Sequence, residues 1–138
     1  MSNSLKAFIV TTDVLFITYW IVAGLIAAGV LNISHEHLYA NYSTAEVNAW
    51  NWSFFPLDIA LSIMGLMAVR AAKTGDARWR PLALISLVLT MTAGLMAISY
   101  WTLLLEFNPS WYLPNLLLVI WPIFFLNDLV QPVQVNDC

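Results

Sequence analysis

Four long apolar stretches constrain this chain more than any other feature, because together they occupy most of its 138 residues. A helix needs about 20 apolar residues to cross the ~30 Å hydrocarbon core of a bilayer, and each stretch meets that length. The sequence therefore predicts an all-α fold, an integral membrane four-helix bundle, as a single transmembrane domain over residues 1–138. The spans run over about Ala7–Leu31, Asn51–Ala72, Pro81–Leu105 and Trp111–Val130.

The charge content excludes several classes of protein. Only 9% of the residues are charged, against about 25% in soluble domains, so a soluble domain is excluded. Five Lys and Arg residues are too few for a nucleic-acid surface. The single cysteine, Cys138, has no partner for a disulfide or a metal site. We expect no cofactor, and the absence of a nucleophile–base pair leans against an enzyme.

The basic residues indicate how the chain is oriented in the membrane. They precede the first stretch or lie around the link between the second and third, whereas the other links contain Glu36, Glu46 and Glu106 and no Lys or Arg. Because positive charge stays on the cytoplasmic side, we expect both termini in the cytoplasm and a long outer loop over residues 32–50. The basic residues are Lys6, Arg70, Lys73, Arg78 and Arg80.

Asp58 is the most informative single residue. It lies about two turns inside the second stretch, where an aspartate costs up to about 2.5–3.5 kcal/mol if it faces lipid. We therefore expect it to face the bundle interior, on one helical face with Ser62 and Gly65. Two roles stay open: a polar clasp that fixes helix register, or a site that binds a ligand or moves a proton.

Polar and aromatic residues of the other stretches lie at about the depth of Asp58. Counting inward from the same boundary reaches Ser99, Thr102 and Asn115. A ligand-binding cluster of these residues with Asp58 is expected to lean toward the outer side. Aromatic residues would form its walls: Trp52, Tyr100, Trp101 and Trp111.

Asp13 is a second acid within an apolar stretch, near the predicted cytoplasmic end. We expect a structural ion pair with Arg78 or Arg80, or with Lys6, because long basic side chains can reach such a site. Asp13 and Asp58 should differ in depth by roughly 10–15 Å, which argues against a catalytic carboxylate pair. A proton relay between them would need intermediates such as Ser62.

The outer loop contains His35, Glu36 and His37. A zinc site needs three or four protein ligands, and Glu46 is the only third candidate nearby. A solvated loop explains these residues better, so we expect no metal site.

Several segments resemble a known family. They include T-D-V-L-F-I-T-Y-W at 12–20, A-W-N-W-S-F-F-P-L-D at 49–58 and F-N-P-S-W-Y-L-P-N at 107–115. The chain is similar to the YvaD-like family of small four-span bacterial membrane proteins, which implies this topology and the bacterial inner membrane. Its architecture also looks like the emopamil-binding and sigma-2 group, which implies a pocket for a hydrophobic amine or sterol. Only Asp58 and Asn115 map onto that pocket.

Three functions follow as expectations. The first is binding of a hydrophobic or cationic small molecule, or a lipid, in an intramembrane pocket centred on Asp58. The second is a non-catalytic accessory subunit of a larger membrane complex. The third is a homo-oligomeric proton-coupled exporter. The lipid bilayer is the one partner that all three share.

Overall fold

The computed structural model describes residues 1–34 and 43–131, and every regular element in these ranges is a helix. The helices are α1 (Asn3–Ala27), α2 (Ala45–Ser53), α3 (Phe55–Lys73), α4 (Trp79–Leu103) and α5 (Pro109–Val130). Four segments are long and apolar enough to cross a membrane: α1, α2 and α3 taken together, α4 and α5. The predicted all-α class and four membrane helices are therefore confirmed.

The helix ends follow from local capping. The Ser2 hydroxyl accepts a hydrogen bond from the backbone N–H of Leu5 at 3.2 Å, so α1 begins before the apolar stretch does. Asn108 caps α5 in the same way, through the N–H of Ser110. Pro109 follows at the first helical position, where its missing N–H costs nothing.

Phe54 separates α2 from α3. It ends the first helix and starts the second, and its N–H bonds to the carbonyl of Asn51. Pro56 then occupies the first turn of α3 and offers no N–H to the preceding helix, which breaks the hydrogen-bond ladder at this point. The break places Asp58 in the first turn of α3.

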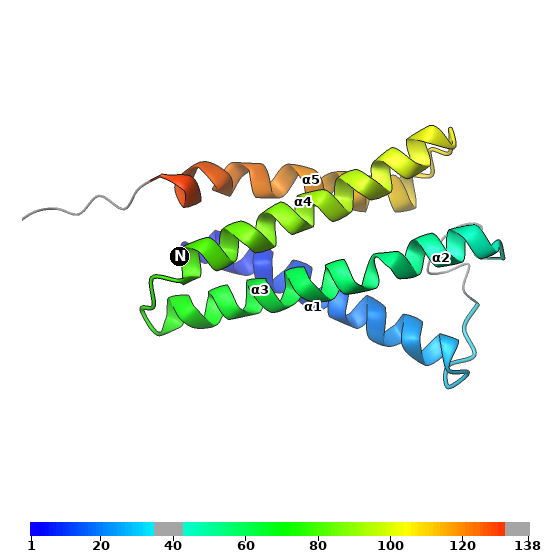
Figure 1. Cartoon of the computed structure of the whole chain (residues 1–138), viewed down its shortest axis with the longest axis horizontal. Helices are drawn as coiled ribbons and strands as arrows, with labels where there is room; N and C mark the ends of the chain where they lie inside the picture. The colour runs from blue at the N-terminus through cyan, green and yellow to red at the C-terminus, as the bar shows by residue number, and fades with distance from the viewer. Residues whose placement is uncertain (35–42, 132–138) are drawn as a thin grey trace, which may run out of the picture.

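The bundle is packed in the order α1, α3, α4, α5 (Figure 1). The N-terminus, the α3–α4 turn and the end of α5 lie at one end of the bundle, which we call the basic end because Lys73, Arg78 and Arg80 are there. The Arg80 guanidinium joins α4 to the end of α5 by donating to the carbonyls of Asp128 and Gln131. The opposite end carries α2 and the α4–α5 turn, and we call it the aromatic end.

The hydrophobic core is concentrated toward the basic end. Its buried members come from all four long helices: Leu5, Ile9, Ala68, Val69, Ala83, Leu87, Trp121 and Leu129. Toward the aromatic end α1 and α5 separate, and the space between them is a cavity.

Candidate functional site

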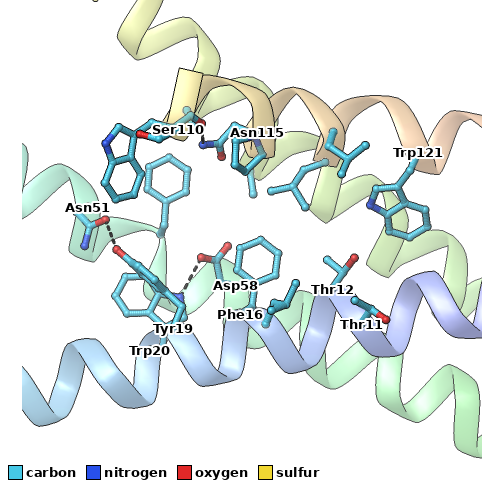
Figure 2. A pocket seen from close by; sticks show the side chains of 18 of the residues that line it. Thr11, Thr12, Phe16, Tyr19, Trp20, Asn51, Asp58, Ser110, Asn115 and Trp121 are labelled. Atoms are coloured by element: carbon cyan, nitrogen blue, oxygen red, sulfur yellow. Dashed lines mark hydrogen bonds between the residues drawn. The ribbon is translucent and has the colours of Figure 1, made fainter. Parts of the chain in front are cut away.

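A cavity of about 440 Å³ lies between α1 and α5, with residues of α3 and α4 behind it (Figure 2). This volume is in the range of small-molecule sites. Asp58 is the only charged residue among the described residues that line it. The rest of the lining is mostly apolar and aromatic, and five of the seven tryptophans of the chain contribute to it: Trp20, Trp50, Trp101, Trp111 and Trp121.

Asp58 is 3% exposed, and its carboxylate has two different environments. Oδ2 accepts a hydrogen bond of 2.9 Å from the indole N–H of Trp20. Oδ1 is buried and has no hydrogen-bond partner. The site is therefore a carboxylate with one oxygen fixed by the protein and one available to a bound group.

The position of Asp58 in the first turn of α3 also bears on its charge. Backbone N–H groups at a helix N-terminus carry a partial positive charge and favour a carboxylate there. Because of the break at Phe54, a helix start lies within the second span, and the buried Asp58 is in its first turn.

A second hydrogen bond joins α1 to α2 at the aromatic end of the cavity. The Tyr19 hydroxyl donates to Asn51 Oδ1 at 2.9 Å, while Nδ2 of Asn51 is buried and has no partner. Both residues line the cavity. Figure 2 shows the Asn51 oxygen directed at Tyr19, so this amide is held at the aromatic end of the cavity.

The cavity is closed at one end and has a mouth in the middle of the bundle. Phe8 of α1 stacks on Trp121 of α5 with ring centroids 5.2 Å apart, which closes the end nearest the core. Leu15 and Leu117 line the cavity but are 64% and 58% exposed. Because both lie near the middle of their helices, the mouth opens sideways, toward the hydrocarbon region of a membrane.

The structure brings together four of the eight residues predicted for the ligand site. Asp58, Asn115, Trp101 and Trp111 all line the cavity. Figure 2 shows Asn115 on the α5 side, opposite Asp58. Asn115 Nδ2 donates to the Trp111 carbonyl at 2.7 Å, so the amide is held against its own helix.

The other four predicted residues lie outside the cavity lining. Ser99 and Thr102 are on exposed parts of α4, and the Thr102 hydroxyl lies 3.4 Å from that of Tyr112. Trp52 and Tyr100 form an outer layer that supports the wall. Trp52 packs on Trp20, and Tyr100 stacks on Trp50 with centroids 4.1 Å apart.

Trp20 and Asn51 were not among the predicted site residues, although both have polar atoms at the cavity. The sequence did indicate that Asp58 needs a hydrogen-bond donor from another helix, since buried carboxylates take such partners. Sequence alone does not show which donor on another helix reaches the acid.

The predicted ion pair of Asp13 is wrong. Asp13 is 1% exposed and lies against Gly65 of α3. Arg78 is paired with Asp76 at 2.6 Å, and Arg80 donates to carbonyls at the end of α5. The helical face of Asp13 points into the core, whereas the arginines lie at the surface of the basic end.

Of the three residues considered as zinc ligands, the structure describes one. His35 and His37 lie outside the described residues, and Glu46 is exposed in the first turn of α2. Over residues 1–34 and 43–131 no three His, Cys, Asp or Glu side chains are grouped as a metal site would need.

Comparison with known proteins assigns the chain to a family. Residues 5–135 match the family of unknown function DUF5360. The chain is 42% identical to the uncharacterized protein YvaD of Bacillus subtilis (strain 168) over 127 residues, which is 92% of each protein. No solved structure matches it. Its four apolar helices are those of an integral membrane protein, and its relative YvaD is bacterial. With a match over nearly its whole length, the chain belongs to the DUF5360 family.

Proposed function

We propose that this protein binds a lipophilic molecule with a cationic or hydrogen-bond-donating head, and that Asp58 is the anchor for that head. The observation that carries the proposal is the unpartnered Asp58 Oδ1 at the wall of an apolar cavity. A buried acceptor without a partner costs about 1–3 kcal/mol, and a donor on a ligand recovers that energy.

The aromatic lining suits a positive head group. Rings of Trp20, Trp50 and Trp101 surround the aromatic end of the cavity, and cations are attracted to the faces of such rings. Asn115 lies across from Asp58 and would orient the head group. The apolar remainder, toward Phe8 and Trp121, would hold a hydrocarbon tail.

The sideways mouth between Leu15 and Leu117 supports entry from the bilayer. A ligand that enters there must be soluble in lipid, which favours amphipathic amines and lipids over sugars or nucleotides. If the basic end faces the cytoplasm of the bacterial inner membrane, as the positive-inside rule predicts, the cavity takes its ligand mainly from the outer leaflet.

The test is a binding titration of the protein in nanodiscs. Tryptophan fluorescence is the readout, because five tryptophans line the cavity. The probes are dodecylamine, which is cationic at neutral pH, and dodecane, which has the same tail but neither a charge nor a hydrogen-bond donor. We expect saturable binding of dodecylamine, and Asp58→Asn should weaken it about tenfold or more, which is about 1.4 kcal/mol.

Asp76→Asn is the matched control, since it removes one carboxylate from an exposed turn far from the cavity. It should bind dodecylamine as the unmodified protein does. Equal dodecylamine binding by the Asp58→Asn variant would overturn the proposal. Equal binding of both probes to the unmodified protein would show that the site selects the tail and ignores the head.

A second candidate function is an accessory subunit of a larger membrane complex. It is favoured by α5, in which only 17% of the most apolar window is buried, against 33–39% in the other three spans. Native mass spectrometry from the source membrane separates the two functions. A stoichiometric assembly with other polypeptides and no small molecule supports the subunit.

A further inference from the structure

Asp13 is a buried acid that the cavity does not use. It projects from α1 against Gly65 of α3, where its Oδ2 occupies the space that a Cβ of residue 65 would fill. The hydroxyl of Ser86, from α4, lies against the same point. Three helices therefore meet around one carboxylate, and Oδ2 is buried without a hydrogen-bond partner.

A single face of α3 connects this carboxylate to the cavity. Asp58, Ser62 and Gly65 are spaced at i, i+4 and i+7, so they follow one another along the helix. Ser62 is 1% exposed, and its hydroxyl is also buried without a partner. Asp58 Oδ1, Ser62 Oγ and Asp13 Oδ2 are three of the five such side-chain atoms in the described part of the chain.

Among the described residues, no positive side chain pairs with Asp13. Lys6 on α1 is exposed two turns away, and Arg70 on α3 is exposed beyond Gly65. The α4 helix contributes Arg80, which is engaged by α5, and Tyr100 at the aromatic end. On α5 the titratable groups are Tyr112 and Asp128, near its two ends. On α1, Tyr19 donates to Asn51 at the aromatic end. Of the titratable groups in the described residues, Asp58 is the one on the same face of α3 as Gly65, against which Asp13 lies.

The hydrophobic core separates Asp13 from the basic end. On α1, Leu5 and Ile9 precede it on the same face, and on α3 Ala68 and Val69 follow Gly65. On α4, Ala83 lies one turn before Ser86. All of these are buried and apolar, so polar side chains continue from Asp13 only toward the cavity.

We propose that Asp13 is a proton-binding site that exchanges its proton with the cavity through Ser62. In the exchange, Asp13 passes its proton toward the Ser62 oxygen while the Ser62 hydroxyl passes its own proton on to the Asp58 carboxylate. No hydrogen bond joins these side-chain atoms directly, so a buried water molecule or a side-chain rotation bridges each gap. Asp13 becomes charged as Asp58 becomes neutral, and no other reactant is needed. A proton is favoured over a metal ion because the meeting point offers one carboxylate and the Ser86 hydroxyl, fewer ligands than a metal ion takes. The inference goes beyond the ligand proposed above and is tested without any ligand.

The test is labelling with dicyclohexylcarbodiimide, which reacts with a protonated carboxylic acid in an apolar site. The acid proton moves to a carbodiimide nitrogen, the carboxyl oxygen bonds to the central carbon, and an acyl shift gives a stable N-acylurea. The full-length protein in nanodiscs is labelled across a pH series, and Asp13→Asn identifies the Asp13 product by mass spectrometry. We expect labelling at acid pH that falls about tenfold for each pH unit above its midpoint.

Two variants test the connection to the cavity. Asp58→Asn removes a like charge, so half-labelling of Asp13 should occur at lower pH, whereas Asp76→Asn should not move it. After a jump from alkaline to acid pH, Asp13 should recover its labelling more slowly in Ser62→Ala. The matched control is Ser99→Ala, because Ser99 is exposed on α4.

Several results would overturn the proposal. These are labelling of Asp13 that does not depend on pH, absence of labelling at acid pH while Asp58 is labelled, and protection of Asp13 by sodium ions at constant pH. Equal recovery rates in the two serine variants would remove Ser62 from the pathway. If dodecylamine fails to bind but Asp13 labels as expected, the proposed ligand is wrong and this inference stands.

Discussion

Trp20 donates its indole N–H to Asp58 Oδ2 over 2.9 Å, and this hydrogen bond joins α1 to α3 beside the cavity. Both residues are buried. The ring of Trp20 also packs on Trp52 and Phe55, with centroids 5.3 and 5.2 Å away, so its N–H is held in place. Trp20 therefore positions the carboxylate and leaves Oδ1 as the oxygen that a ligand can reach.

Trp20→Phe should lower the free energy of unfolding by about 1–3 kcal/mol, because it leaves a second buried carboxylate oxygen without a donor. Denaturant unfolding in detergent measures this change. Trp52→Phe is the control, since it removes the same ring atoms from a neighbour that does not bond to Asp58. In an Asp58→Asn background the cost of Trp20→Phe should change by about 0.5–3 kcal/mol, and strict additivity would contradict the coupling.

The turn between α3 and α4 should respond to acid. Arg78 donates to Asp76 through its side chain and its backbone N–H, and these hydrogen bonds hold the pKa of Asp76 below its usual value. Because the pKa is lower in the folded protein, this stabilisation is present above the ordinary aspartate pKa and is lost as the pH falls through the folded value. The Arg78 side chain is exposed and that of Asp76 is partly exposed, so the effect on stability is small.

Thermal unfolding of the protein and of Asp76→Asn, at neutral pH and at acid pH, measures the contribution of this turn. The unmodified protein should have the slightly higher melting temperature at neutral pH, and the difference should vanish in acid. A difference that grows as the pH falls would contradict the assigned sign.

The fold could be predicted from the length of the apolar stretches, because a membrane leaves a helix as the only choice for each of them. The division of the second span into α2 and α3 was harder to predict from the sequence. It depends on Pro56 acting as a helix start, and a proline inside an apolar run can also be tolerated as a kink.

The candidate site could be predicted only in part, because counting from the membrane boundary gives depth but not rotation about the helix axis. Ala93, Ala97 and Trp101 are spaced at i, i+4 and i+8 and line the cavity together. Ser99 and Thr102 have a similar depth, but that spacing places them on other faces of α4.

The same argument explains the wrong partner for Asp13. Leu5, Ile9 and Asp13 follow one another at four-residue spacing, and the first two belong to the core. The acid therefore belongs to the core face of α1. That pattern was present in the sequence, whereas the missing Cβ of Gly65 that makes room for the acid is a property of another helix.

Trp121 offers a test of the closed end of the cavity. Its indole N–H is buried without a partner, while its ring stacks on Phe8. Trp121→Phe should be neutral or stabilising, because it removes the unpartnered donor and keeps an aromatic ring. Trp121→Ala should cost about 3–5 kcal/mol, since it leaves a hole in the core. Chemical denaturation of both variants measures these changes. A clear loss of unfolding free energy in Trp121→Phe would indicate that the N–H has a hydrogen-bond partner.

Gly65→Ala and Gly24→Ala form a matched pair for the meeting point of α1, α3 and α4. A Cβ at residue 65 would meet Asp13 Oδ2, with Ile9 Cγ2 at 2.8 Å and Ser86 Oγ at 2.9 Å, so these side chains or their helices must shift. We expect Gly65→Ala to lower the unfolding free energy by about 1–3 kcal/mol. Gly24 has nothing within 4 Å of its added Cβ, so Gly24→Ala should stabilise α1 by up to about 1 kcal/mol.

Thermal unfolding in nanodiscs compares the two alanine variants under one condition, and carbodiimide labelling then reports on the acid itself. Because the added methyl group would displace the Asp13 carboxyl from Gly65, Gly65→Ala should also change the pH at which Asp13 is half-labelled. Gly24→Ala should leave that pH unchanged. Equal stabilities and equal labelling profiles for both variants would mean that Asp13 does not occupy the space that Gly65 leaves open.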